Sequence, residues 1–361
     1  MLKPFWQSVQ KLLRIIVSVM NEKANIMNKN LVLKVDGLST HFIYKNRTAK
    51  AVRDVSFTLE KGKTLAVVGE SGSGKSVTAL SIMGLLGFPG EVTAGKMLYR
   101  HSQGNILDLS TIDDKTHRKI RGAEISMIFQ EPMTSLNPLF TIGNQISEMV
   151  KLHDSSSKKE ALRRAIDILD LVEIPSAKQR INDYPHQLSG GMRQRVMIAI
   201  ALICNPALLI ADEPTTALDV TIQAQILDLM RRLQAELSMS ILFITHSMGV
   251  VAEVADEVAV MYAGEVVEQG KIYSLFDKPS HPYTQGLLAS IPNAKRDIDE
   301  QGNRTRLRPI EGIVPSVYAI PQGCTFAPRC QYSESKCREN AILAPIQVDH
   351  LSRCWKSKEV V

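Results

Sequence analysis

Continuous apolar runs and amphipathic segments alternate along most of the chain. Short apolar runs that end at polar residues or glycine predict buried parallel strands, at residues 64–68, 125–129, 207–211, 240–245 and 258–262. Apolar residues at helical spacing predict helices, at residues 75–86, 142–171 (interrupted by a polar break at 154–159), 193–203 and 222–237. Alternating apolar and polar positions predict two half-buried strands at 31–35 and 52–59, joined by a polar turn at 44–50. Because strands alternate with helices, the pattern favours an α/β fold with a parallel sheet covered on both faces.

Residues 1–30 have a different pattern, which predicts an N-terminal extension. Apolar residues between Phe5 and Val17 fall near helical spacing, with basic residues among them. A basic amphipathic helix lying on a membrane surface is one interpretation. We expect instead a poorly ordered leader, or residues upstream of a later start such as Met27. The sequence has no run of about 18 apolar residues and no export signal, so we expect the chain to stay in the cytoplasm.

The character of the chain changes after residue 270. Seven prolines lie between residues 279 and 328, and four of the five cysteines lie beyond Gly323. This change predicts a main domain at 31–270 and a separate C-terminal domain at 271–361. The formal net charge of +6 does not by itself indicate a nucleic-acid partner, and five cysteines in 361 residues exclude a disulfide scaffold.

A phosphate-binding loop is predicted at residues 69–76, which read GESGSGKS. They fit the pattern G-x-x-x-x-G-K-[ST] between a predicted strand and a predicted helix. The glycines allow backbone conformations that turn several N–H groups toward one point, where the helix N-terminus adds partial positive charge. Lys75 would reach the β- and γ-phosphates of a nucleotide, and Ser76 would bind Mg²⁺. The predicted phosphate-binding residues are Gly69, Glu70, Ser71, Gly72, Ser73, Gly74, Lys75 and Ser76.

Two carboxylates follow the apolar run that ends at Ala211. Ligands of parallel sheets bind at the carboxyl ends of the strands, so Asp212 and Glu213 are expected beside the phosphate loop. Asp212 is predicted to hold Mg²⁺, directly or through water, and Glu213 to polarise a water molecule for attack on the γ-phosphate. Gln130 and His246 end two other buried strands and should reach the same edge, although either alone is more often a turn residue.

A second helix start in the chain is suited to binding an anion. Residues 188–195 read LSGGMRQR and lead into the helix predicted at 193–203. Ser189 can cap that helix, and Gly190 and Gly191 expose its first N–H groups. One phosphate loop already serves one nucleotide, so this second start is predicted to meet a different partner.

The string LSGGMRQR resembles the signature motif of the ATPase subunits of ABC transporters, and the resemblance extends over residues 31–270. It implies an α/β P-loop NTPase cassette with a RecA-like parallel sheet core and a helical subdomain at about 131–192, followed here by a small C-terminal domain that contains four cysteines. In that family two subunits pack head to tail. The signature of one then closes over the γ-phosphate of the ATP that the other holds with Mg²⁺.

The resemblance also implies roles for single residues. Residues 69–76 match the Walker A motif of the family, and residues 208–212 match its Walker B strand. Glu213 matches the catalytic base, Gln130 the Q-loop glutamine at the Mg²⁺ ion, and His246 the switch histidine that contacts the γ-phosphate.

Residues of three further motifs are implied to touch nucleotide. Asp219 matches the D-loop aspartate, and Ser189, Gly190 and Gly191 belong to the signature. The aromatic residue that stacks on adenine matches Phe42 best, but Tyr44 is close and the turn length leaves both possible. Every catalytic position carries the usual residue of the family, so the subunit is expected to be catalytically competent.

Finer strings resemble one subfamily, the dipeptide and oligopeptide importer ATPases. They are QEPMTSLNP at 130–138, YPHQ at 184–187 and HPYT at 281–284. The resemblance implies an ATPase subunit that powers import of di- and oligopeptides from the cytoplasmic face of the inner (plasma) membrane. Its implied partners are a second, paralogous ATPase subunit, two integral-membrane permease subunits and an extracytoplasmic peptide-binding protein.

Other functions remain open at the level of sequence. Relatives with the same strings import nickel, glutathione or antimicrobial peptides, so the cargo is not encoded here. A soluble ABC-type ATPase that acts on nucleic acid or ribosomes usually has two cassettes or a long coiled-coil insertion. This chain shows one cassette and no such insertion, so we expect no nucleic-acid partner. An ordinary P-loop GTPase or kinase would not explain residues 188–195, and the guanine-reading N-K-x-D motif is absent.

The C-terminal cysteines have the spacing C-x₅-C-x₆-C-x₁₆-C. This spacing has no tight C-x₂-C pair, and a cytosolic setting disfavours disulfides. The spacing alone leaves metal binding and packed free thiols both possible. The resemblance to the peptide importers implies a 4Fe–4S cluster, which needs four thiolates. Its ligands would be Cys324, Cys330, Cys337 and Cys354.

Overall fold

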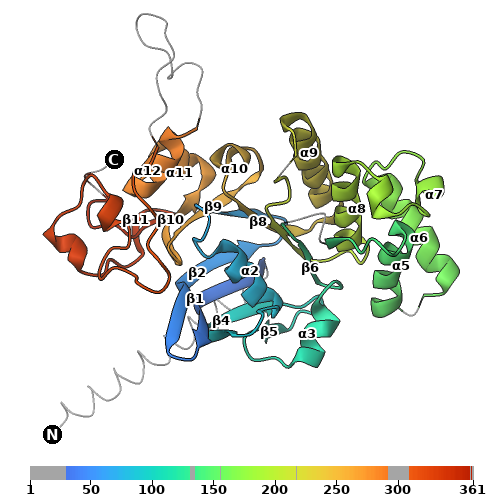
Figure 1. The fold of residues 1–361 in the computed structure, drawn as a ribbon, viewed down its shortest axis with the longest axis horizontal. Coiled ribbons are helices and arrows are strands. Elements are labelled where there is room, and N and C mark those ends of the chain that lie inside the picture. The colour runs from blue at the N-terminus through green and yellow to red at the C-terminus, as the bar shows by residue number, and fades with distance from the viewer. Residues whose placement is uncertain are drawn as a thin grey trace, which may run out of the picture.

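The computed structural model describes residues 30–130, 135–154, 156–216, 218–291, 309–357 and 359. The predicted leader therefore lies almost entirely outside the described residues. In Figure 1 a large sheet runs through the middle of the molecule, with a helical lobe at one end and the C-terminal region at the other. No helix among the described residues is long and apolar enough to cross a membrane.

The large sheet has eight strands in the order β11-β12-β10-β9-β3-β8-β7-β6. Its five parallel strands are buried between two covering layers, which explains their continuous apolar runs. They confirm the five strands predicted from those runs, with ends shifted by a residue or so. The parallel strands are β3 (Thr64–Val68), β6 (Ile125–Ile128), β7 (Leu208–Asp212), β8 (Ser240–Thr245) and β9 (Glu257–Tyr262).

A second, antiparallel sheet has four strands in the order β2-β1-β4-β5. The predicted turn at 44–50 is shorter than expected, because both strands continue to a two-residue connection at Lys45 and Asn46. The third and fourth strands and helix α3 (Asp114–Ile120) were not predicted from the sequence. The first half of β4 is largely exposed, so its residues do not alternate between apolar and polar. The strands are β1 (Leu31–Tyr44), β2 (Arg47–Glu60), β4 (Gly90–Arg100) and β5 (Ile106–Asp108).

Helix α2 (Lys75–Met83) joins the two sheets. Its buried Ile82 belongs to one hydrophobic cluster with Leu33 and Phe57 of the antiparallel sheet and Ile210 of the parallel sheet. The helix is three residues shorter than predicted, because Gly84 ends it in a left-handed conformation. The start of α2 is therefore fixed by packing on both sides, and the phosphate loop precedes it.

The helical lobe contains α5 (Ile142–His153), α6 (Lys158–Leu171) and the short α7 (Ala177–Arg180). The predicted polar break separates α5 from α6, and Ser157 caps α6 by accepting the N–H of Glu160.

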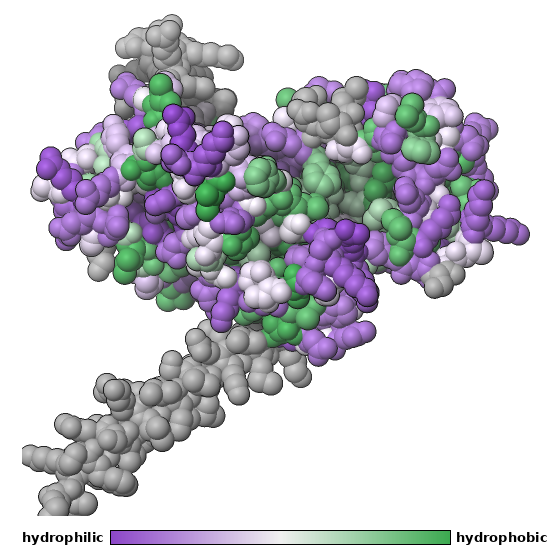
Figure 2. Space-filling model, turned by 60° about the horizontal axis from the view of Figure 1, so that its bottom comes forward, coloured by the Kyte–Doolittle hydropathy of each residue, from purple (hydrophilic) through white to green (hydrophobic). Residues whose placement is uncertain are grey.

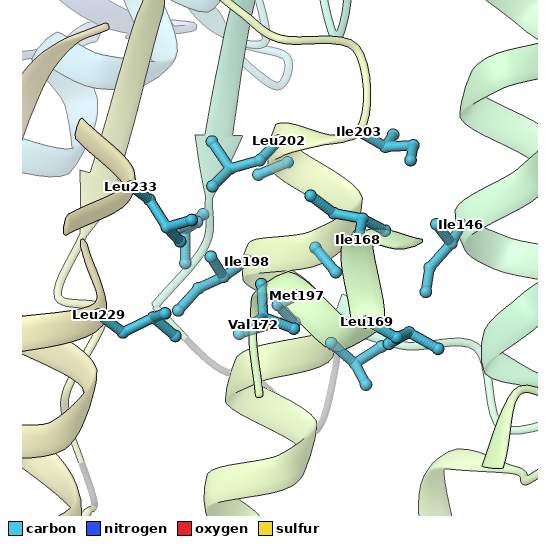
Figure 3. Close-up of a cluster of buried hydrophobic side chains, with 14 of the residues drawn as sticks. Ile146, Ile168, Leu169, Val172, Met197, Ile198, Leu202, Ile203, Leu229 and Leu233 are labelled. Carbon is cyan, nitrogen blue, oxygen red and sulfur yellow. The ribbon is translucent and has the colours of Figure 1, made fainter. Parts of the chain in front are cut away.

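The lobe packs against the sheet through α8 (Gly190–Leu202). Side chains of α8 lie between Leu229 and Leu233 of α9 (Val220–Leu237) and Ile168 and Leu169 of α6 (Figure 3). These residues form one hydrophobic cluster, so the helix that carries the signature belongs to both the lobe and the core.

The C-terminal region adds three antiparallel strands to the parallel sheet. Strand β10 pairs with β9 and β12, and β12 pairs with β11. The rings of Tyr283 and Phe326 pack against Tyr262 of β9 in tilted and edge-on arrangements, at ring-centroid distances of 4.7 and 5.2 Å. The composition change near residue 270 thus marks more irregular structure, and the region shares its core with the parallel sheet instead of folding around one of its own. Its elements are β10 (Glu265–Lys271), α11 (Ile272–Asp277), α12 (Pro282–Ala289), η2 (Ala327–Arg329), η3 (Ser335–Arg338), β11 (Ala344–Gln347) and β12 (His350–Ser352).

A buried carboxylate fixes the loop that precedes α12. Glu268 of β10 accepts the backbone N–H groups of Ser280 and His281 at 2.6 and 3.0 Å. His350 of β12 lies with its Nε2 2.8 Å from the same carboxylate. The Glu268 side chain is fully buried, and its hydrogen bonds compensate for the loss of water. This contact sets the start of α12 and thereby the place of Tyr283.

Candidate active site

The phosphate loop follows β3 and ends where α2 begins at Lys75, as predicted. Gly74 has φ 99°, and a Cβ built there would lie 2.6 Å from the carbonyl oxygen of Ala51. A Cβ at Gly69 would lie 2.1 Å from the carbonyl oxygen of Met261. Only glycine fits at these two positions, because the loop passes directly against neighbouring backbone.

Lys75 folds back over this loop. Its Nζ donates to the carbonyl oxygens of Gly69 and Glu70 at 2.8 and 3.1 Å. Burial lowers the pKa of the Lys75 ammonium, and nearby carboxylates, Glu213 foremost, oppose that shift. The hydroxyl of Ser73 is buried and has no hydrogen-bond partner among the described residues. A loop with a buried ammonium and an unpartnered hydroxyl fits a bound phosphate group.

Two oxygen ligands for a cation meet between α2 and β7. The hydroxyl of Ser76 donates to Oδ1 of Asp212 at 3.1 Å. Burial raises the pKa of Asp212, although the bond from Ser76 and the Lys75 charge oppose the shift. A hydroxyl and a carboxylate beside a phosphate loop suit Mg²⁺, which prefers oxygen ligands shared with phosphate.

The predicted residues at the strand ends converge on Glu213. Its Oε2 accepts from Gln130 Nε2 at 3.3 Å and lies 3.1 Å from Nδ1 of His246. Thr216 Oγ1 donates to the same oxygen at 2.9 Å. Burial alone would raise the pKa of Glu213, but the bonds from Thr216 and His246 outweigh it and the net shift is downward. The structure therefore brings Gln130, Glu213 and His246 together and holds the carboxyl group ionised.

The sequence analysis missed Thr216. A hydroxyl three residues after a functional carboxylate was a local signal that could have identified it. Gln194 was missed as well: it is buried in α8, and its Nε2 donates to the carbonyl oxygen of Pro214, one residue after Glu213. Glutamines are mostly exposed, so a buried glutamine could be identified only from the tertiary structure.

The signature residues lie apart from this centre. Ser189 is the N-cap of α8 and accepts the N–H of Met192 at 3.3 Å. Asp219 is the N-cap of α9 and accepts the N–H of Ile222 at 2.9 Å. Ser189, Gly190 and Asp219 are exposed, and in Figure 1 the sheet separates α8 and α9 from α2. The chain does not bring its own signature to its own phosphate loop.

The two candidate adenine-stacking residues differ in exposure. Phe42 is half-buried on β1, and its ring lies against Gly90, where a Cβ would come within 2.8 Å of Cε1. Tyr44 is 56% exposed at the end of the same strand, with Lys45 Nζ 5.3 Å from its ring centroid. The choice between them stays a prediction.

The four C-terminal cysteines line one small cavity, together with Phe326, Tyr332 and Trp355. All four are free thiols. Burial raises the pKa of the Cys354 thiol to about 11, and the neighbouring cysteines add to the shift. Within the described part of the chain, no three His, Cys, Asp or Glu side chains converge closely enough to hold a single metal ion. The cavity thus gathers the predicted thiols without forming a compact mononuclear site.

Two family profiles match the chain. The family described as "ABC transporter" matches residues 52–216, and the one described as "Oligopeptide/dipeptide transporter, C-terminal region" matches residues 267–337. A putative peptide import ATP-binding protein of Brucella melitensis is 51% identical over 336 residues, which cover 92% of this chain and 99% of that protein. This chain belongs to the ATP-binding proteins of ABC transporters. The predicted α/β ABC cassette is confirmed.

Other relatives of this ABC ATPase are similar over nearly their whole length. The oligopeptide transport ATP-binding protein AppD of Bacillus subtilis is 53% identical over 91% of this chain and 97% of its own. The dipeptide transport ATP-binding protein DppD of Escherichia coli is 48% identical over 90% and 96%. A solved dimer of the ATP-binding cassette MJ0796 with ADP and Pi matches with a TM-score of 0.58 at 28% identity. It covers 66% of this chain and 98% of that one, so the C-terminal region extends beyond a minimal cassette.

Proposed function

We propose that this ABC ATPase powers import of di- and oligopeptides across the cytoplasmic membrane, acting at its cytoplasmic face. The observation that carries the proposal is the joint match of a cassette with a peptide-transporter C-terminal region, shared over the full length of relatives named for peptide import. Nickel or glutathione as cargo has no comparable support among these relatives.

The proposed chemistry is in-line hydrolysis of the γ-phosphate of ATP. The phosphate loop and Lys75 would bind the phosphates. Ser76, Asp212 and Gln130 would hold Mg²⁺, which when bound would supply positive charge beside the phosphates. Glu213 is ionised and accepts a proton from the attacking water, so it acts as the general base. His246 lies with its Nδ1 3.1 Å from the Glu213 carboxylate and would contact the γ-phosphate.

The proposal requires a second ATPase subunit, most simply a paralogue of this chain. The N-terminus of α8 is exposed and faces away from the phosphate loop of its own chain. A partner packed head to tail would bring its signature to this loop and receive Ser189 and Gly191 at its own. Each pocket would then be complete only in the closed pair.

The proposed contact with the permease subunits is a groove beside α5. Figure 2 shows a hollow with hydrophobic residues on its walls between the lobe on the right, which holds α5 and α6, and the rest of the molecule. Exposed hydrophobic surface of this kind commonly marks a protein interface. Phe129 lies in the groove next to Gln130, so docking there would connect the permease to the catalytic centre. Lining residues include Leu85, Lys115, Arg118, Lys119, Phe129, Met149 and Leu152.

A 4Fe–4S cluster is the proposed occupant of the cysteine cavity. Four cysteines around one cavity provide the number of ligands that such a cluster would take. The cluster would serve as a structural or electron-carrying group. Chemical assay of anaerobically purified protein should give about four iron and four sulfide per chain. Protein that binds neither element at stoichiometric level would reject the cluster.

The test of the ATPase function uses Glu213→Gln in the purified transporter, reconstituted with its peptide-binding protein. The substitution keeps the shape of the side chain but removes the general base, so we expect peptide-stimulated hydrolysis to fall by about 10²–10⁴-fold. ATP affinity should stay within about threefold, because Lys75 and the loop are unchanged. Wild-type hydrolysis rates in this variant would remove Glu213 from its role. Uptake that responds to nickel or glutathione and not to peptides would overturn the proposed cargo.

A further inference from the structure

Glu70, the second residue of the phosphate loop, is held by the C-terminal region at two points. Its backbone N–H donates to the hydroxyl of Tyr283 at 2.9 Å. Its carboxylate receives both Nη groups of Arg329, at 2.6 and 3.1 Å. Tyr283 belongs to α12 and Arg329 to η2. A part of the protein outside the minimal cassette therefore forms hydrogen bonds with the phosphate loop.

The Arg329 side chain is held by several contacts within the protein. Its Nε donates to the carbonyl oxygen of Glu311 at 2.9 Å, and Nη2 also donates to that of Ile310 at 3.1 Å. The guanidinium lies over the ring of Tyr262, and the side chain is only 4% exposed. The hydrogen bonds to Glu70 raise the pKa of Arg329 further above its usual range. A bidentate pair with every other donor engaged fixes geometry as well as charge.

The backbone of Glu70 is hydrogen-bonded to groups of the phosphate loop that would bind nucleotide. The carbonyl oxygen of Glu70 accepts from Lys75 Nζ at 3.1 Å and from the N–H of Ser73 at 3.2 Å. A displacement of Glu70 would therefore move both the ammonium and a loop amide. The loop contains two glycines at positive φ, so contacts from outside decide which of its conformations is populated.

The other end of the connection is the cysteine cavity. Cys330 directly follows Arg329, and the N–H of Cys330 donates to the carbonyl oxygen of Ala327 in η2 at 3.3 Å. The N–H of Ala327 donates to the carbonyl oxygen of Cys324 at 3.1 Å. The short segment that carries Arg329 is thus bounded by two of the four cysteines that line the cavity.

We propose that Arg329 is a positioning residue for the phosphate loop. Through Arg329, the chemical state of the four cysteine thiols in the cavity controls the affinity of the loop for nucleotide. The inference deepens the proposed function and rests on it only in assigning the loop to ATP. Because coupling between two sites is reciprocal, nucleotide must also change the cysteine cavity. Arg329 contacts the phosphate loop through the Glu70 carboxylate, so its effect passes through that residue.

The first experiment measures affinity for MgADP and MgATP with the purified full chain. Arg329→Gln and Glu70→Gln should each weaken binding by about tenfold, and Arg329→Gln should change turnover at saturating ATP in the reconstituted transporter by less than about threefold. The double variant should be no weaker than either single one, because both remove the same connection. Arg329→Lys keeps the positive charge but loses the bidentate geometry of the guanidinium, so its affinity for nucleotide should lie between those of Arg329→Gln and wild type.

Arg164→Gln is the control. Arg164 is also a partly buried arginine that donates to a backbone carbonyl oxygen, that of Ile203, and pairs with Asp154, but among the described residues it contacts neither the phosphate loop nor the cysteine cavity. Its affinity for nucleotide should stay within about twofold of wild type. Affinities of Arg329→Gln and Glu70→Gln within twofold of wild type, or losses that add in the double variant, would overturn the inference.

The second experiment follows alkylation of the cysteine thiols by N-ethylmaleimide, in full-length Cys204→Ala protein after dialysis against a chelator. Saturating MgADP should slow alkylation of the four C-terminal cysteines at least threefold, and Arg329→Gln should abolish this protection. Equal protection in both proteins, or none in either, contradicts the coupling. The affinity measurements and the alkylation assay use the purified chain and depend neither on peptide transport nor on a bound cluster, so failure of those proposals would be seen separately.

Discussion

The buried Glu268 carboxylate offers a quantitative test of how the C-terminal region is attached. Glu268→Gln preserves volume, but an amide has one acceptor oxygen where the carboxylate has two. It cannot accept both backbone N–H groups, of Ser280 and His281, and also satisfy His350. Hydrogen bonds to a charged group contribute roughly 1.5–3 kcal/mol each, and an unpaired buried donor costs about 1–3 kcal/mol. Glu268→Gln should therefore lower the free energy of unfolding by about 2–4 kcal/mol.

The assay is urea unfolding followed by the fluorescence of Trp355, which lies in the C-terminal region and contacts Glu339 through its Nε1. Trp6→Phe removes the only other tryptophan, so the signal reports this region alone. Asp349→Asn is the control, because its pair with Lys271 is more than half exposed and surface ion pairs of this kind contribute little to stability.

Equal midpoints for Glu268→Gln and Asp349→Asn would refute the reasoning, since buried and exposed carboxylates would then be equivalent. A functional consequence follows from the same contact. The loop held by Glu268 leads into α12, where Tyr283 bonds to the phosphate loop. Glu268→Gln should therefore also weaken nucleotide binding, and a normal affinity in a clearly destabilised protein would show that Tyr283 holds its place independently.

Two further predictions concern titrating groups. Burial lowers the pKa of His281 to about 3 from an unfolded value of 6.5, so the unfolded chain binds the extra proton and stability is lost as pH falls below about 6.5, by up to about 1.4 kcal/mol per pH unit. His281→Asn keeps an acceptor for the N–H of Tyr283 and should give a shallower loss of stability between pH 6.5 and 5, measured by urea unfolding; parallel curves would exclude His281 as the group. Thr216→Val removes a hydrogen bond that holds the pKa of Glu213 down, so the acid limb of the pH–kcat/KM profile should move to higher pH, whereas an unmoved limb would mean that Thr216 does not tune the base.

The phosphate loop, the two carboxylates and the five parallel strands were predictable from sequence. Their sequence signals are local. Residues 69–76 form the phosphate loop from their own backbone, and buried parallel strands are short apolar runs. The convergence of Gln130, Glu213 and His246 was also predictable, because the carboxyl ends of parallel strands meet at one edge.

Only the tertiary structure decided how the C-terminal region is used. Composition at 271–361 suggested a separate domain, but β12 pairs with β10 and Arg329 reaches Glu70 across 259 positions. The amino-acid sequence does not indicate which buried arginine pairs with which carboxylate, because many such pairings fit the same local pattern. Packing of the core selects one of them. The chain by itself thus determined the chemistry of the nucleotide site, and folding decided what holds that site in place.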